Sequence, residues 1–437
     1  MSSSSYELVL TSSPDGPIVA YDASTGVEVT RFPGTRSPRR GLTVAGNSFI
    51  AASHVSPDTA AVSIHLYNWH TSSVLHRFSV PEFVAPLAAT PDGGYIFAGG
   101  QSGTIHCFSV PSGNVIKSFP AHTKPISCLQ LSIDGSLVIS GSDDGSIMVI
   151  PTFQIVESSD SNSSSKDLIL QHWKKAHSDS VTALSTGIGL CNSMLVSSSL
   201  DSTCKFWNLL EGTLLRTVTF PCAINGLAMA IDLSSSDSHL FAAGSDGSVY
   251  KASMNKAKKP RKPQNNNNEA DDDQELMKKW NKSHVGSTES VVVVNEGRNL
   301  VSAGEDGSVW MWEIDTEEVT MVIKDNSNGL MEGSISDMIV ASGITEYRGK
   351  GKSSDNGGGC SNRLTSSELL KEEVVRSMKK IMEVGEVLRV VEEDKRRAIN
   401  MLESAIAMYE KLLELILEEA LKGSSDGNSF GSIFITF

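Results

Sequence analysis

The segment DGSVWMW, residues 306–312, is the clearest copy of a phrase that occurs seven times in this chain of 437 residues: a turn, four strand residues and a last position that is usually aromatic. The other copies are DGPIVAY ending at Tyr21, AVSIHLY at Tyr67, SGTIHCF at Phe108, DGSIMVI at Ile150, DSTCKFW at Trp207 and DGSVYKA at Ala252. Their end points lie 46, 41, 42, 57, 45 and 60 residues apart. A period of about 40 to 45 residues with short alternating strands is typical of propeller blades. The sequence therefore predicts an all-β, seven-bladed propeller.

The two ends of the repeat region predict how the ring closes. The segments Glu7–Thr11, Ile18–Tyr21 and Val27–Phe32 look like strands b, c and d of a blade that lacks its first strand, a. After the last phrase, Val319–Lys324 supplies a d strand and Ser334–Ala341 supplies one further strand. We expect this last strand to complete the first blade, because such a closure removes exposed sheet edges. The predicted propeller spans residues 1–342.

Two polar insertions interrupt the repeat, at about 157–167 and 254–275. The first is rich in Ser and Asp, and we expect a d strand after it near Leu168–His172. The second holds KAKKPRKP, an Asn run and three Asp residues. Because such segments cannot bury apolar area, both are predicted to be disordered loops between strands c and d.

Composition narrows the function classes. A net charge of −14 argues against nucleic-acid binding over the whole surface, because that needs concentrated Lys and Arg. The N-terminus, MSSSSYELVL, has no signal-peptide pattern, and no run approaches the roughly 18 apolar residues of a membrane span. The cysteines form no CxxC or Cys/His cluster, so they are expected to be reduced core residues, with no metal or cofactor. They are Cys107, Cys128, Cys191, Cys204, Cys222 and Cys360.

An ordered set of polar residues recurs in register in three units: a His before strand a, a Ser in strand b, an Asp in the b–c turn and a Trp in strand c. The matching sets are His177, Ser197, Asp201 and Trp207; His284, Ser302, Asp306 and Trp312; and His122, Ser140 and Asp144, with Ile150 in place of Trp. This set resembles the hydrogen-bonded tetrad of the WD40 family, and the resemblance implies a buried structural network. The first three blades lack most of it, and no Trp-Asp dipeptide occurs in the chain.

Ser, His and Asp are also the residues of a hydrolase triad. A triad needs an activated hydroxyl that faces a substrate, whereas this set repeats in several blades, so we interpret it as architecture. The chain has no GxSxG motif, and GKGKS at 349–353 fails the P-loop spacing because Glu346 stands where the first Gly is needed. No catalytic residue is predicted, and an enzyme is not expected.

After a flexible Gly/Ser linker at 343–364, the apolar period changes from two to three and a half. The apolar seam predicts a coiled-coil helix over 365–423, followed by a tail at 424–437. Homodimerisation or pairing with a partner helix is the favoured reading, and docking of the helix on the propeller is the alternative. The apolar seam residues are Leu370, Val374, Ile381, Val384, Leu388, Val391, Ala398, Leu402, Ala405, Tyr409, Leu412 and Ile416.

The second insertion carries five cations within eight residues. A nuclear-import signal or an RNA-contacting patch is the functional reading, and a solvated charge run is the bland one. We favour import, because it needs only access to the loop. The cations are Lys256, Lys258, Lys259, Arg261 and Lys262.

The propeller with its terminal helix, and the segments ELVLTSSPDGPIVAYDASTG and FAGGQSGTIHCFSVPSG, resemble the WD40 subunits of the nucleolar pre-60S complex that joins maturing large ribosomal subunits. The resemblance implies a nuclear, nucleolar and nucleoplasmic scaffold that has two non-propeller partners, docks the Midasin ATPase and supports removal of an internal transcribed spacer. It leaves direct RNA contact open.

Two other propeller classes are alternatives. A substrate receptor of a cullin ubiquitin ligase commonly carries a Trp-Asp-x-Arg element after strand c, but WNLL at 207–210 and WEID at 312–315 stand there in this chain. A heterotrimeric G-protein β subunit is disfavoured, because in that class the coiled coil precedes the propeller.

Overall fold

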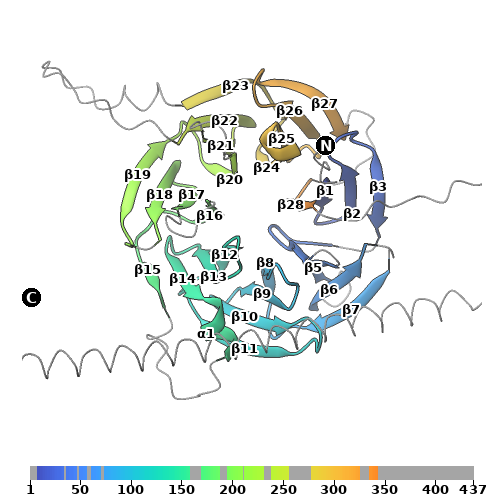
Figure 1. Cartoon of the computed structure of the whole chain (residues 1–437), viewed down its shortest axis with the longest axis vertical. Coiled ribbons are helices and arrows are strands. Elements are labelled where there is room, and N and C mark those ends of the chain that lie inside the picture. Colours follow the sequence, from blue (N-terminus) through green and yellow to red (C-terminus); the bar gives the residue numbers. More distant parts are fainter. Residues whose placement is uncertain are drawn as a thin grey trace, which may run out of the picture. The chain divides into compact units, whose positions relative to one another are not determined.

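The computed structural model forms a ring of seven four-stranded antiparallel sheets around a central channel (Figure 1). The seven-bladed propeller predicted from the repeat is therefore confirmed. The structure describes residues 7–33, 36–46, 49–56, 61–69, 73–157, 169–187, 194–209, 211–230, 238–254, 277–324 and 334–342. The predicted coiled-coil seam, the cations of 256–262 and most of both insertions lie outside the described residues.

Each blade has four strands, a to d from the channel outward. The a strands are β28 Asp337–Ser342, β4 Leu42–Ala45, β8 Val84–Ala89, β12 Ile126–Leu131, β16 Val181–Thr186, β20 Ile224–Ala230 and β24 Thr288–Val294 for blades 1 to 7. The b strands are β1 Glu7–Ser12, β5 Phe49–Val55, β9 Tyr95–Gly100, β13 Leu137–Ser142, β17 Met194–Ser199, β21 His239–Gly244 and β25 Asn299–Gly304.

The outer half of each blade follows the same order. The c strands are β2 Ile18–Asp22, β6 Val62–Asn68, β10 Thr104–Ser109, β14 Ile147–Pro151, β18 Thr203–Asn208, β22 Ser248–Ser253 and β26 Val309–Glu313. The d strands are β3 Glu28–Phe32, β7 Val74–Ser79, β11 Val115–Pro120, β15 Gln171–Trp173, β19 Leu214–Thr219, β23 Met277–Ser283 and β27 Glu318–Lys324. Every copy of the repeated phrase supplies strand c, and the last residue of each copy is buried.

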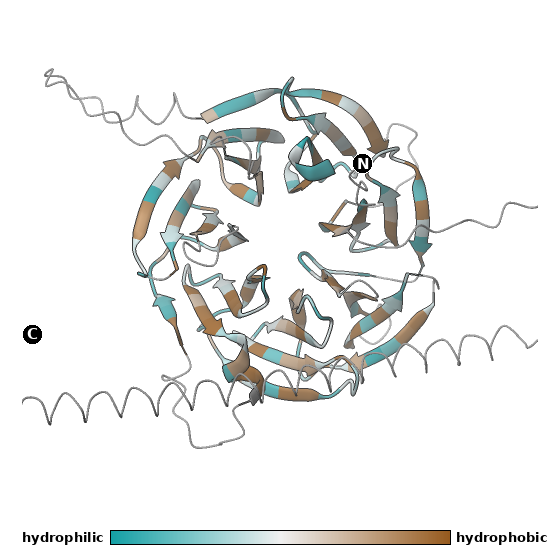
Figure 2. Ribbon diagram, viewed as in Figure 1, coloured by the Kyte–Doolittle hydropathy of each residue, from teal (hydrophilic) through white to brown (hydrophobic). Residues whose placement is uncertain are grey.

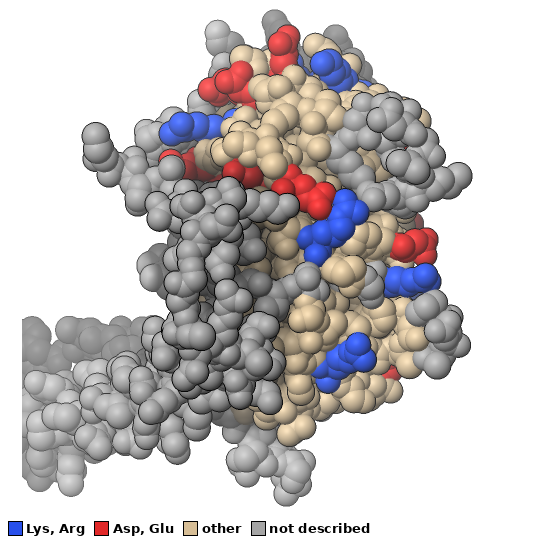
Figure 3. Space-filling model, turned by 90° about the vertical axis from the view of Figure 1, so that its right-hand side faces the viewer, with Lys and Arg blue, Asp and Glu red and all other residues tan. Residues whose placement is uncertain are grey.

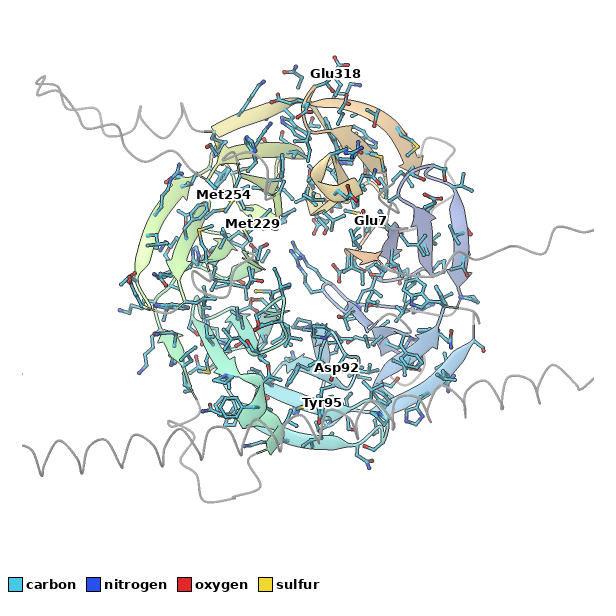
Figure 4. All side chains as sticks on the ribbon, viewed as in Figure 1. Glu7, Asp92, Tyr95, Met229, Met254 and Glu318 are labelled. Atoms are coloured by element: carbon cyan, nitrogen blue, oxygen red, sulfur yellow. The ribbon has the colours of Figure 1, made fainter. Side chains whose placement is uncertain are left out.

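Blade 1 is built from both ends of the repeat region. Strand β28 pairs antiparallel with β1, with Val9 opposite Val340, and the sheet order is β28-β1-β2-β3. The predicted closure is thus confirmed. Glu7, at the start of β1, also binds the neighbouring blade: its carboxylate accepts the backbone N–H of Asn295 at 2.6 Å (Figure 4). Asn295 opens a short 3₁₀ turn, η1 Asn295–Gly297, that follows β24. Blades 1 and 7 are therefore held together by a side chain as well as by their cores.

The hydrophobic core is divided among the blade junctions. The described residues form seven apolar clusters, and each cluster joins two neighbouring blades. Figure 2 shows brown, apolar positions along the strands of every blade. Within blade 6, Met229 lies on the channel wall and Met254 lies farther out (Figure 4). Because each core is small and repeated, the ring exceeds the usual size of a single-core domain.

Blade 4 departs from the predicted boundaries. Strand d is β15 Gln171–Trp173, not Leu168–His172, because Trp173 donates its Nε1–H to the carbonyl of Gly212 at 2.8 Å and fixes the strand against blade 5. A helix that the sequence reading missed, α1 Thr152–Glu157, precedes it. Ile155 of this helix is buried in the cluster between blades 3 and 4. The helix thus ends where the predicted insertion begins, and residues 158–168 of that segment lie outside the described residues.

The cysteines at positions 107, 128, 204 and 222 carry free thiols, and the first three are buried. Within the described ranges, no three His, Cys, Asp or Glu side chains are grouped as a metal site would need. No described helix has the length and apolar character to cross a bilayer. In the side view of Figure 3, the coloured Lys/Arg and Asp/Glu groups are interspersed.

Candidate functional site

The polar sets singled out in the sequence lie in three different blades, all at the same face of the ring. In blade 7, Ser302 Oγ lies 2.7 Å from both Trp312 Nε1 and His284 Nε2. The other ring nitrogen, Nδ1 of His284, is 2.7 Å from Ser308 Oγ, and that hydroxyl donates to Asp306 at 2.6 Å. The Asp306 carboxylate itself lies 3.7 Å from Nδ1. The four predicted residues are thus brought together, but Ser308 connects the Asp to the His.

The hydrogen-bond partners fix the direction of each donor in blade 7. Ser308 donates its single hydroxyl proton to Asp306. Its oxygen must therefore accept the Nδ1–H of His284. Nε2 of that neutral ring is then an acceptor, and it takes the hydroxyl proton of Ser302. Ser302 in turn accepts the Nε1–H of Trp312. The network is an ordered chain of donors from the indole to the carboxylate.

Blade 4 repeats this arrangement without the Trp. His122 Nε2 is 2.8 Å from Ser140 Oγ, and His122 Nδ1 is 2.7 Å from Ser146 Oγ. The Ser146 hydroxyl donates to Asp144 at 2.5 Å, while the direct distance from Nδ1 to the carboxylate is 3.8 Å. Asp144 also accepts the N–H and hydroxyl of Thr123, which ties the b–c turn to the loop before strand a.

Blade 5 has the direct form of the network. His177 Nδ1 lies 3.0 Å from Asp201 Oδ2, and His177 Nε2 lies 2.8 Å from Ser197 Oγ. Trp207 donates its indole N–H to the same hydroxyl at 2.9 Å. Thr203 takes the place of the connecting serine, 3.2 Å from Nδ1 and 2.6 Å from the carboxylate.

The hydroxyl two residues after the Asp is therefore a fifth member that sequence reasoning missed. It is Ser146, Thr203 or Ser308, within the phrases DGS, DST and DGS. The signal was present in the sequence, because a Ser or Thr at this position of an Asp turn can reach the carboxylate two residues back. The same hydroxyl also links the Asp side chain to the b–c turn that contains it.

The electrostatics agree with a neutral, structural role for the histidines. Burial lowers the pKa of His122 and of His284 to about 4, against the smaller opposing effect of the nearby Asp. Burial also lowers the pKa of His177. Burial alone would raise the pKa of Asp201, but the Thr203 hydroxyl and the His177 ring outweigh it and lower that pKa to about 2. The serine hydroxyls at the centres of the networks are fully buried, so they face other side chains and not a substrate.

Two blades that lack the tetrad hold other networks at the same face. In blade 3, Glu82 accepts from the hydroxyl of Ser102 at 2.6 Å and lies 2.8 Å from Nε2 of His106. In blade 6, Asp246 accepts from the hydroxyl of Tyr250 and from Nζ of Lys279, each at 2.8 Å. Glu82 therefore joins the loop before strand a of blade 3 to the b–c turn and to strand c. Asp246, in the b–c turn of blade 6, is joined to strands c and d. We call the face that carries these loops and turns the tetrad face.

The histidines also join adjacent blades. The backbone N–H of His177 donates to the carbonyl of Gly145 at 3.0 Å, and that of His284 donates to Gly247 at 2.8 Å. Both glycines have positive φ, 74° and 80°. A Cβ on Gly145 would lie 2.5 Å from the His177 carbonyl oxygen, so only glycine fits the turn. Each b–c turn is thereby bonded to the loop of the next blade.

Comparisons with known proteins agree with this geometry. The family model described as "WD domain, G-beta repeat" matches residues 113–150 and 169–208, which cover parts of blades 3 to 5. The Arabidopsis thaliana protein ROOT INITIATION DEFECTIVE 3 is 30% identical over 313 residues, 70% of this chain and 66% of that protein. Human WD repeat-containing protein 18 is 24% identical over 69% of this chain and 65% of its own length.

A third relative carries a functional name. The Schizosaccharomyces pombe pre-rRNA-processing protein crb3/ipi3 is 25% identical over 47% of this chain and 45% of its own length. The matched regions therefore span just under two thirds, or less, of these relatives. The repeat match, the seven closed blades and the buried His-Ser-Asp networks agree with one another. The chain therefore carries WD40 repeats and is similar to WD40-repeat proteins.

Proposed function

We propose that this protein is a non-enzymatic scaffold subunit in the nuclear biogenesis of the large ribosomal subunit, where it supports removal of an internal transcribed spacer from precursor ribosomal RNA. The observation that carries the proposal is the sequence similarity, over 47% of this chain, to a relative named for pre-rRNA processing. The names of the relatives lend no support to the ubiquitin-ligase alternative.

The propeller supports a scaffold role through its surfaces. Closure through β28 leaves no broken blade, and the tetrad-face turns are held by carboxylates and histidines whose bonds are internal. Faces fixed in this way can bind several proteins at constant separations. We propose that these faces bind the other subunits of the pre-60S assembly complex and a Midasin-type ATPase.

Residues 365–423 are proposed to add a second copy through a coiled coil. Burial of each seam residue in a partner helix would contribute roughly 1.5 to 3 kcal/mol. We therefore expect the full chain to sediment as a dimer and the variant with Leu402, Leu412 and Ile416 changed to Asp to sediment as a monomer with an intact propeller. A wild-type monomer at tens of micromolar would contradict self-association.

The cations of residues 256–262 are proposed to direct nuclear import. Changing Lys256, Lys258, Lys259, Arg261 and Lys262 to Ala should move a fluorescently tagged chain from the nucleus to the cytoplasm. A variant of five other surface cations is the matched control for charge. Nuclear accumulation of the loop variant would return these residues to a solvated charge run, or show that partners carry the protein in.

The functional test is depletion followed by rescue. We expect depletion to cause precursors that retain an internal transcribed spacer to accumulate on RNA blots, and wild-type protein to clear them. The triple seam variant should fail to clear them although it is folded and nuclear. Normal precursor levels after depletion would overturn the proposed function.

A further inference from the structure

The loop that leads into blade 2 places an arginine in a conformation that normally belongs to glycine. Residues Pro38–Gly41 form a β-turn, in which Gly41 N–H donates to the Pro38 carbonyl at 3.0 Å. Arg40 occupies the third position of this turn with φ of 61°. That position favours Gly or Asn, and any other side chain there is strained. Arg40 therefore places a long charged side chain at a position whose backbone conformation favours glycine.

This guanidinium reaches across the ring. Arg40 Nη2 donates to the backbone carbonyl of Asn225, in blade 6, at 2.6 Å. The carbonyl of Arg40 accepts the N–H of Leu87, in blade 3, at 3.0 Å. Arg39 pairs with Glu289 of blade 7 at 3.2 Å. One four-residue turn at blade 2 thus binds three other blades, one of which, blade 6, lies across the channel.

The neighbours of the turn extend these ties to the closing strand. Ser336 donates its hydroxyl to the carbonyl of Ser37 at 2.9 Å. Asp337, the first residue of β28, accepts the N–H of Leu42 in blade 2 at 3.3 Å. Burial raises the pKa of Asp337 to about 6, against the opposing charge of Arg40. The strand that closes the ring from the far end of the propeller sequence therefore begins beside the Arg turn.

The position of the turn explains why a cation is useful there. The a strands of all seven blades line a channel cavity of about 460 Å³, and each presents its unpaired backbone edge to it. Arg40 and Asp337 both belong to this lining. Unpaired edges leave N–H and C=O groups without strand partners. The turn satisfies two of them, the Asn225 carbonyl and the Leu87 N–H, in blades that do not touch each other.

We propose that the turn Pro38–Gly41 holds the ring closed by linking blades across the channel at the tetrad face, and we call this turn the latch. The Arg40 guanidinium makes its bond across the channel. The strain at Arg40 is offset by its bonds to blade 3 and, across the channel, to blade 6. Release of the Arg40 guanidinium leaves the Asn225 carbonyl of blade 6 with only the longer bond from Arg39 Nη2, at 3.4 Å, and so loosens the blade seams at this end of the channel.

Cys128 is a native reporter for the latch. It lies in the cluster between blades 4 and 5, is 3% exposed, and is close enough to Arg40 for that charge to act on its thiol. Burial raises the pKa of Cys128 to about 11, and Arg40 opposes this rise. Removal of the cation alone would therefore slow thiolate chemistry at Cys128. Opening of the seam would accelerate it, so the two effects have opposite signs.

The experiment measures the rate at which dithionitrobenzoate modifies each cysteine of the native full-length chain, by peptide mass spectrometry. For Arg40→Ala and Arg40→Gly we expect modification at Cys128 to be at least tenfold faster than in wild type. Arg40→Gly also removes the φ strain, so it should be the more stable of the two variants. Cys107 and Cys204, both fully buried in other clusters, serve as internal references.

Arg298→Ala, which removes an 80% exposed guanidinium, is the matched control and should leave all rates unchanged. An unchanged or slower rate at Cys128 in both Arg40 variants would overturn the latch. An equal rise at Cys107, Cys128 and Cys204 would also overturn it, because it would report global unfolding and not a local opening.

Discussion

Replacing Ser302 by Ala tests the donor order deduced for blade 7. The hydroxyl is fully buried, and it both accepts from Trp312 Nε1–H and donates to His284 Nε2. The substitution leaves two buried polar groups without partners, and each such loss costs about 1 to 3 kcal/mol. We expect Ser302→Ala to lower the free energy of unfolding by about 2 to 6 kcal/mol.

Asp306→Ala gives the comparison that makes the test sharp. The Asp306 side chain is 20% exposed, so water can replace part of what its carboxylate accepts from Ser308 and from the N–H of Val285. We expect a loss of about 1 to 3 kcal/mol, smaller than for Ser302→Ala. Urea unfolding followed by fluorescence measures both, with Ser185→Ala on the channel wall as the control for losing a hydroxyl. If Asp306→Ala costs more than Ser302→Ala, or Ser302→Ala costs no more than the control, the donor order is wrong.

Three further predictions concern closure, acid and the turn glycines. Truncation after Asn328 removes β28, so the exposed edge of β1 should make the protein aggregate, and a soluble, cooperatively unfolding truncation would refute closure. The pKa of His122 and of His284 is about 4 in the folded protein and near 6.5 when unfolded, so stability should be full above pH 6.5 and fall progressively toward pH 4, and a flat urea midpoint over that range would contradict the buried neutral rings. Gly145→Ala should cost more than 1 kcal/mol in thermal unfolding, because its Cβ would meet the His177 carbonyl, and a silent substitution would show that the turn can move.

The blades could be predicted from the sequence because their determinants are local. An Asp-Gly turn followed by alternating apolar residues fixes strand c, whatever the distant contacts. The closing strand β28 was also predictable, because a blade short of one strand and a surplus strand imply each other. Placement of the Ser and Asp of the three sets followed from their constant offset to strand c, and the His lies before strand a in each set. The sequence did not predict the local structure that is fixed by contacts with a neighbouring blade.

The α1 helix shows why such structure escapes sequence reasoning. Six residues are too few for a helical period to stand out, and its stability comes from Ile155, which is buried between blades 3 and 4. The boundary of β15 depends likewise on Trp173 binding Gly212 of blade 5. In blade 3, Ser102 stands where the tetrad has Asp, and the acid is Glu82, which precedes strand a and binds Ser102 and His106, so a search for the tetrad order reports only an absence.

The three histidines give the propeller its coupling between blades. Each ring holds the serine and, directly or through a hydroxyl, the Asp of its own blade, while its backbone N–H holds the turn of the blade before. A change in one of these b–c turns therefore acts on two blades, at the junctions of blades 3 and 4, 4 and 5, and 6 and 7, through bonds that leave the apolar clusters intact. For a scaffold this matters more than the stability of any one blade, because partners bound to different blades keep a fixed separation only if neighbouring turns cannot move independently.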